Sequence, residues 1–157
     1  MALITAPGAL PELHIVGAYF QVVVDGRTKG SRFTDVGGLS MELNVVEITT
    51  SGMLRTQTRK TPGLAKYGEL TLKRKFSMNM EFWDWVKEIR DGGPAEKFRH
   101  NGSVYQLASH GIGEPVAEWK FINAWPSKWS ISDPDVSSDD AIDESITLAI
   151  ESLERVK

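Results

Sequence analysis

Apolar and polar residues alternate along most of the chain with the period of two that is typical of half-buried β-strands. Phe20, Val22 and Val24 share one face of a strand predicted over residues 18–25, and Asp25-Gly26 then predicts a hairpin turn. The same alternation predicts further strands over residues 32–36, 69–76, 104–109, 116–125 and 145–150. The pattern therefore predicts a mainly β protein.

Residues 41–50 predict a strand that is apolar on both sides. Its apolar residues divide between the two faces, with Met41, Leu43 and Val45 on one and Val46 and Ile48 on the other. Such a strand is either central in a sheet or covered by another chain. A turn at Ser51-Gly52 leads into a polar strand over residues 55–60, which Pro62-Gly63 is expected to end. We therefore expect an extended β-hairpin over residues 41–60.

Helical periodicity occurs in one segment, residues 77–91. Its apolar residues recur at i, i+3, i+4 and i+7 and so share one face, namely Phe82, Trp85, Val86 and Ile89. Ser77 or Asn79 can cap the start of this helix, and Gly92-Gly93-Pro94 stops it. The predicted helix is long enough to cover one side of a small sheet.

The order of these elements lacks the alternation of strands and helices that builds parallel sheets. It predicts two packed antiparallel sheets that form a small β-barrel or sandwich with one flanking helix. The 157 residues fit a single domain. Its expected parts are an N-terminal arm (1–16), strands with the extended hairpin (17–76), the helix (77–91) and C-terminal strands (100–157).

Composition excludes several classes of function. A net charge of only −3 argues against a general nucleic-acid binder, and the lack of cysteine excludes disulfides and thiolate chemistry. The first residues lack a basic start, and Pro7, Gly8 and Pro11 interrupt any apolar run. No apolar stretch is long enough to span a bilayer. We expect a protein made in the cytosol without a signal peptide or membrane anchor.

Candidate chemistry is sparse. The three histidines, His14, His100 and His110, have no metal-ligand spacing, and none pairs in sequence with an obvious nucleophile. An acidic run follows a calcium-loop template at five positions, namely Asp133, Asp135, Ser137, Asp139 and Glu144. Ser138 stands where that template needs glycine, so a solvated acidic loop is favoured. We expect no catalytic residue, no metal and no cofactor.

Charge is unevenly distributed along the chain. Residues 55–75 hold seven basic residues and one acidic residue, whereas residues 133–157 hold eight acidic residues and two basic ones. The two segments are either two solvated faces or complementary surfaces on two copies, and a contact of the second kind closes rings or builds filaments. The candidate subunit-interface residues are Met41, Leu43, Val46, Ile48, Met53, Leu54, Arg55, Arg59, Lys60, Lys73, Lys75, Asp133, Asp135, Asp139 and Asp140.

An ordered set of short blocks resembles one family. The blocks are residues 33–39 (FTDVGGL), 61–67 (TPGLAKY), 70–74 (LTLKR), 81–85 (EFWDW), 123–128 (NAWPSK) and 145–153 (SITLAIESL). Together they resemble the tail tube proteins of contractile phages and of extracellular contractile injection systems, which have an Hcp-like fold. The resemblance covers nearly the whole chain. Residues 150–152 depart from it, because family members often have His-Glu-Gly there.

The resemblance implies a structural subunit and not an enzyme. Subunits would join side by side, usually six to a ring, and the rings would stack into a hollow tube inside a contractile sheath. The tube would deliver DNA or protein cargo, and its partners would be itself, the sheath protein, baseplate or spike proteins and a tube terminator. One face of residues 41–50 would pack on the chain's own core and the other on a neighbour. Residues 1–16 and 51–54 would make ring-to-ring contacts.

Three alternatives remain at this stage. A baseplate tube initiator of the same fold forms one ring and does not polymerise, and an Hcp-like protein of a type VI system is a secreted ring. From a different class, a β-barrel that binds a small ligand would need an apolar cavity, and no sequence feature points to one.

Overall fold

The computed structural model describes residues 19–108, 113–135, 137 and 139–157. Within these ranges the chain forms mostly strands, which confirms the mainly β prediction. The elements in chain order are β1 (Tyr19–Val24), β2 (Thr28–Phe33), β3 (Asp35–Gly37), β4 (Met41–Ser51), β5 (Thr56–Tyr67), β6 (Leu70–Lys75), α1 (Glu81–Arg90), α2 (Ala95–Phe98), β7 (His100–Leu107), β8 (Ala117–Ile131), β9 (Asp143–Ala149) and β10 (Ser152–Arg155). The predicted N-terminal arm, residues 1–16, lies outside the described residues.

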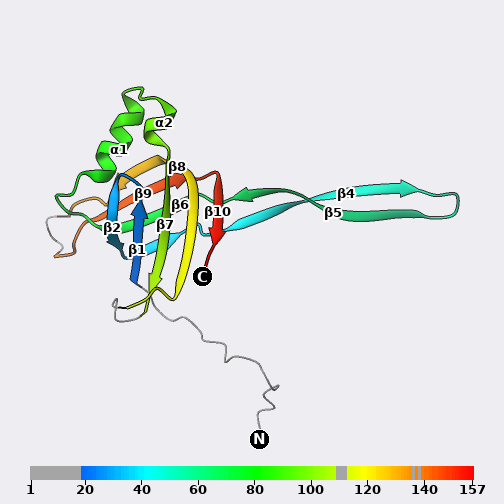
Figure 1. Ribbon diagram of the computed structural model, residues 1–157, viewed down its shortest axis with the longest axis horizontal. Coiled ribbons are helices and arrows are strands. Elements are labelled where there is room, and N and C mark those ends of the chain that lie inside the picture. Colours follow the sequence, from blue (N-terminus) through cyan, green and yellow to red (C-terminus); the bar gives the residue numbers. More distant parts are fainter. Residues whose placement is uncertain (1–18, 109–112, 136, 138) are drawn as a thin grey trace, which may run out of the picture.

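The body of the molecule is a strongly bent antiparallel sheet with the strand order β2-β1-β7-β8-β9-β6-β3 (Figure 1). β10 pairs with the first half of β8, and the path starts at β2 and ends at β3 without closing into a barrel. β8 is the longest strand, with 15 residues, and it serves both halves of the body. Its first half pairs with β7, and its second half pairs with β9. The body is therefore a small sandwich whose two halves share one strand.

A corner in β8 corrects one prediction. Alternation predicts that Trp119, Phe121 and Trp125 share a face, but the side chains buried from Phe121 onward are Phe121, Ala124 and Pro126. Asn123 has a φ of 52°, and the pairing register with β7 shifts at the same point. A residue in the left-handed region adds a bulge and turns the strand. The faces of β8 therefore exchange at Asn123, where the strand passes from one half to the other.

The core lies between the two halves and beneath α1. It comprises Val22, Val24, Phe33, Leu70, Leu72, Phe82, Trp85, Val104, Phe121, Ala124, Ile146 and Leu148. Phe82 and Trp85 of α1 enter it as predicted, and the Trp85 Nε1 donates a hydrogen bond to the Phe98 carbonyl at 2.6 Å. The helix begins at Glu81, four residues later than predicted. Asn79 Oδ1 accepts a hydrogen bond from the Glu81 N–H at 3.0 Å just before that start.

Two strand boundaries differ from the prediction. The returning strand expected over residues 32–36 is instead β2, which starts at Thr28 because the turn at residues 25–27 is short and pairs Val24 with Thr28. β3 is a separate strand that pairs with β6. The four-residue helix α2 has no signal in the sequence pattern.

The hairpin of β4 and β5 projects far from the body (Figure 1). Residues 41–60 are correctly predicted as a hairpin, but β5 continues to Tyr67, through Pro62 and Gly63. Proline is tolerated in strands that have a free edge, and particularly at a bulge. Both conditions hold here, because Pro62 pairs with Val45 at a register shift and β5 has no other described neighbour. The dipeptide that was expected to end the strand therefore lies inside it.

Candidate functional site

The projecting hairpin exposes its apolar residues on both faces. Val46 and Ile48 have exposed fractions of 46% and 51%, and Met53 and Leu54 at the tip are fully exposed. Met41, Leu43, Val45 and Leu64 are exposed as well. The expectation that one face of residues 41–50 packs on the chain's own core is therefore wrong. The apolar side chains whose pattern predicted burial remain exposed, because β4 and β5 leave the body as an isolated pair of strands.

An isolated two-stranded hairpin is at best marginally stable in water, and its two outer edges carry unpaired backbone groups. The pairing register places Val46 opposite Thr61 and Ile48 opposite Arg59 on one face. Glu47 and Lys60 lie opposite each other on the other face, with 3.5 Å between the Lys60 Nζ and the Glu47 carboxylate. The hairpin thus offers a partner an apolar stripe, basic side chains and two open strand edges.

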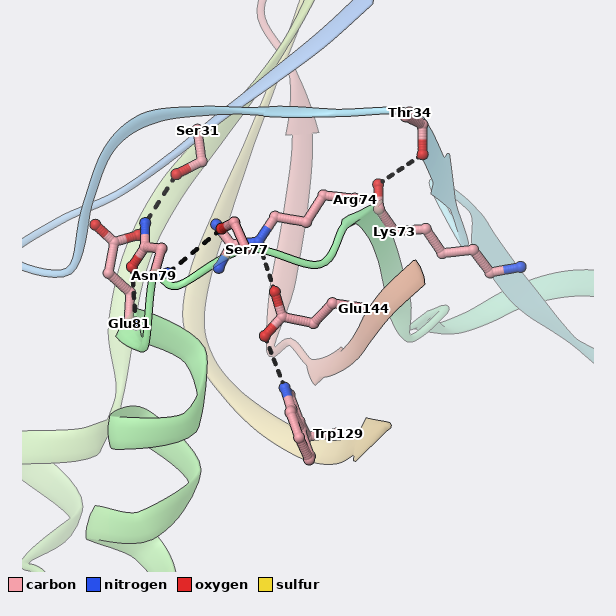
Figure 2. Close-up of polar contacts among 9 residues, drawn as sticks. All are labelled: Ser31, Thr34, Lys73, Arg74, Ser77, Asn79, Glu81, Trp129 and Glu144. Atoms are coloured by element: carbon pink, nitrogen blue, oxygen red, sulfur yellow. Dashed lines mark hydrogen bonds and ion pairs between the residues drawn. The ribbon is translucent and has the colours of Figure 1, made fainter. Parts of the chain in front are cut away.

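The segregated charges partly meet within one subunit. β6 lies beside β9, so Lys75 reaches Asp143 at 2.7 Å and Arg74 reaches Glu144 at 2.7 Å. For Lys75 the structure therefore adds a third arrangement to the two that the charge pattern left open, namely an ion pair within one subunit. Lys73 follows the same register opposite Ser145. Figure 2 shows these strands from the side, with the Lys73 carbonyl accepting a hydrogen bond from the Thr34 hydroxyl.

The ion pair of Arg74 and Glu144 is the buried polar centre of the body. The Arg74 Nε donates to one Glu144 oxygen at 2.7 Å, and the Trp129 Nε1 donates to the other at 2.9 Å (Figure 2). Glu144 is only 2% exposed, and the Arg74 guanidinium lies 4.2 Å from the centre of the Phe82 ring. Both carboxylate oxygens of Glu144 are thus engaged by side chains of the body.

The acidic loop before β9 is exposed and lies at the opposite end of the molecule from the hairpin tip (Figure 1). Asp133, Asp135, Asp139 and Asp140 are its acidic residues. Hydrogen bonds from the hydroxyl and the backbone N–H of Ser137 lower the pKa of Asp135. Among the described residues, no three potential ligands gather into a metal site. The structure groups the predicted hairpin residues but leaves the acidic loop far from them.

His100 joins the helical layer to the sheet. Its Nε2 accepts a hydrogen bond from the Arg27 Nε at 3.1 Å, its ring meets Trp85 edge-on, and Arg27 also pairs with Glu88. Burial, followed by the charge of Arg27, lowers the pKa of His100 below its ordinary value of 6.5. A neutral imidazole in this arrangement is a structural acceptor. The other two histidines, His14 and His110, lie outside the described residues.

We expect acid to destabilise the free subunit through His100. Because the pKa of His100 is lowered on folding, the unfolded chain binds more protons than the folded one at pH values below 6.5. This contribution is fully present above that pH and is lost as the pH falls. Urea unfolding at about pH 7.5 and about pH 5.5 measures it. The His100→Gln variant, which does not titrate, should show a flatter pH dependence; an unchanged dependence would contradict this assignment.

An apolar groove beside the start of α1 was missed by sequence reasoning. It has a volume of about 650 Å³ and is lined by Phe76, Ser77, Met78, Asn79, Met80, Trp83, Trp129 and Glu144. Trp83 and Trp129 form one wall of it and pack edge-on against each other, with 4.9 Å between ring centres. The available signal was the apolar spacing of Phe76, Met78 and Met80 before the helix, although the contact with Trp129 depends on the tertiary fold. No helix in the described part of the chain is long and apolar enough to cross a membrane.

Many solved structures share this fold, including the following three. The sheath–tube complex of the extracellular contractile injection system PVC has a TM-score of 0.75 at 22% identity, covering 92% of this chain and 93% of the other. The tube-terminating cap of the anti-feeding prophage has a TM-score of 0.78 at 20% identity, covering 98% of both chains. The sixfold-symmetrised baseplate of the anti-feeding prophage gives 0.67 at 16% identity, covering 94% and 97%.

A comparison with curated protein sequences gives no significant match. By contrast, the family described as T4-like virus tail tube protein gp19 matches residues 16–154, nearly the whole chain. The match spans the bent sheet, the helix and the projecting hairpin together. Proteins of this family are structural tube components, not enzymes. The chain therefore belongs to the T4-like tail tube protein family.

Proposed function

We propose that the chain is the inner-tube subunit of a contractile tail or contractile injection system. Six subunits form a ring, and rings stack into a hollow tube inside a contractile sheath. The observation that carries this proposal is the hairpin of β4 and β5, whose apolar residues are exposed on both faces in the single subunit. The sixfold symmetry of the similar baseplate structure supports the ring size.

Ring formation covers the exposed hairpin. A hairpin that leaves one subunit and lies on the next adds its strand edges to a neighbouring sheet, so backbone hydrogen bonds supply part of the affinity. Burial of the apolar stripe around Val46 and Ile48 contributes about 25 cal/mol for each Å² removed from water. Because the donor surface and the receiving surface differ, the contact repeats from copy to copy and closes a ring.

The tube acts mechanically. The partners we propose are the sheath protein on the outside, baseplate or spike proteins at one end and a terminator at the other, as in the similar sheath–tube and cap structures. Contraction of the sheath drives the tube into a target envelope, and the lumen carries DNA or protein cargo. The mature protein is then located in an assembled particle.

Electron microscopy and light scattering of the purified protein test this function. We expect rings or tubes whose fraction rises with protein concentration, and co-expression with the sheath protein should promote longer tubes. Single rings that never stack would favour the tube initiator or the Hcp-like alternative. A protein that stays monomeric at high concentration, also in the presence of the sheath protein, would contradict the proposal.

A further inference from the structure

The groove beside α1 is an apolar hollow on the body that remains uncovered. Met78 at its rim is 99% exposed, and Phe76 and Met80 are exposed as well. Its wall is the edge-on pair of Trp83 and Trp129, and Trp129 is held in place by its hydrogen bond to Glu144 (Figure 2). A firm aromatic wall facing flexible methionines suits an inserted aliphatic or thioether side chain. Apolar hollows of this kind mark interaction sites.

The tip of the hairpin has matching chemistry but cannot reach the groove of its own subunit. Met53 and Leu54 are two fully exposed apolar residues in sequence. β4 has 11 residues, so at about 3.3 Å per residue the tip lies roughly 36 Å from the base of the hairpin. Residues 76–80, which line the groove, come directly before α1. α1 and the acidic loop lie at the other end of the long axis of the molecule from the hairpin tip (Figure 1). A tip and a groove at opposite ends can meet only between two copies.

Charges beside the two surfaces are complementary. Arg55 follows the tip directly, just before β5, and Arg59 lies in β5; both are exposed. The acidic loop is tied to the groove, because the Phe76 N–H donates a hydrogen bond to the Ile142 carbonyl at 2.8 Å. The Ser132 N–H likewise donates to the Asp143 carbonyl at 2.8 Å, so the acidic loop that holds Asp133 and Asp135 begins and ends beside the segment that lines the groove. An approaching tip brings its arginines toward these carboxylates, which favours association and sets the orientation of the two copies.

From this we infer that the groove is the receptor for the hairpin tip of a second copy, with Met53 and Leu54 seated against Trp83, Trp129 and Met78. The inference rests on the proposed function and specifies its contact. One end of each subunit inserts into the opposite end of the next, so every bound copy presents a fresh tip and a fresh groove. Such a heterologous contact is repeated without limit unless it closes.

Disulfide trapping tests this pairing, and the absence of cysteine from the natural chain leaves no background reaction. Leu54→Cys and Met78→Cys replace residues that are 96% and 99% exposed, so the free subunit should fold normally. The two single variants are mixed, assembled and oxidised. A disulfide requires Cα atoms within about 7 Å, so the expected mixed dimer reports direct contact. In the double variant, the expected product is a ladder of multimers.

The matched control combines Leu54→Cys with Asp91→Cys. Asp91 is exposed just after α1 and lies about 16 Å along the helix axis from Met80. We expect roughly tenfold more mixed dimer with Met78→Cys than with this control, given the distance limit on disulfides. Tubes that form without this preference would overturn the pairing and leave the proposed function intact. A failure of the natural protein to form rings or tubes, together with no cross-link, would overturn both.

Discussion

We expect aspartate at both Val46 and Ile48 to abolish ring and tube formation while the isolated subunit stays folded. In the free subunit both side chains are about half exposed, so the substitutions should change its stability by only about 0.5 kcal/mol. In the assembled tube the same positions would face a neighbour. An unpaired carboxylate buried there costs several kcal/mol, and the cost recurs at every subunit contact.

Light scattering and electron microscopy measure the loss of assembly, and thermal unfolding reports the fold of the free subunit. The matched control carries Thr49→Asp and Ser51→Asp, with the same charge and spacing on the opposite face of the same strand. That face already holds the ion pair of Glu47 and Lys60, so the control should still assemble. If the Val46→Asp, Ile48→Asp variant formed normal tubes, the apolar stripe could not be part of the subunit interface.

The second large effect is expected on the stability of the body of the subunit, at its buried ion pair. We expect Glu144→Ala to lower the free energy of unfolding by about 3–5 kcal/mol, because it leaves the buried Arg74 without its counter-charge. Arg74 is only 6% exposed, and its Nη2 already lacks a hydrogen-bond partner in the described structure. The Trp129 Nε1 would lose its acceptor as well. For a chain of this length the loss corresponds to a fall in melting temperature of roughly 6–20 °C.

Urea unfolding should be measured in the Val46→Asp, Ile48→Asp background, because self-association would otherwise add to the apparent stability. The neighbouring pair supplies the control. Lys75 and Asp143 are partly exposed on the same two strands, so Asp143→Ala should cost only about 0–1 kcal/mol. The Arg74→Met, Glu144→Leu double variant should be more stable than Glu144→Ala alone. Equal losses at Asp143 and Glu144 would contradict a special role for the buried pair.

The strands, the helix and the hairpin could be predicted from the sequence because their signals are local. Periodicity, however, reports that a side chain is buried somewhere and does not say by which chain. For residues 41–50 this ambiguity produced the wrong expectation that one face of the strand packs on the chain's own core. Pro62 led to a wrong prediction of where the second hairpin strand ends. A proline breaks a central strand but is tolerated beside a bulge in a two-stranded ribbon with open edges.

The remaining features of the site depend on contacts between distant segments. Arg74 and Glu144 are 70 residues apart and meet only because β6 pairs with β9. The groove likewise needs Trp129 of β8 beside Trp83 of α1. At Asn123, strand alternation gives no warning that the backbone will take a positive φ and exchange the two faces. Such features follow from topology, which the spacing of apolar residues leaves open.

The corner at Asn123 also governs how the subunit withstands force. β8 is hydrogen-bonded to β7 and β10 on one side of the corner and to β9 on the other, so the two halves share a backbone. Neither half can detach without breaking the ladder of a strand that the other half needs. The body should therefore unfold as one cooperative unit with no low-energy partial opening. In the proposed tube, a subunit under the force of sheath contraction would then hold or fail as a whole, and would not lose one half of the body before the other.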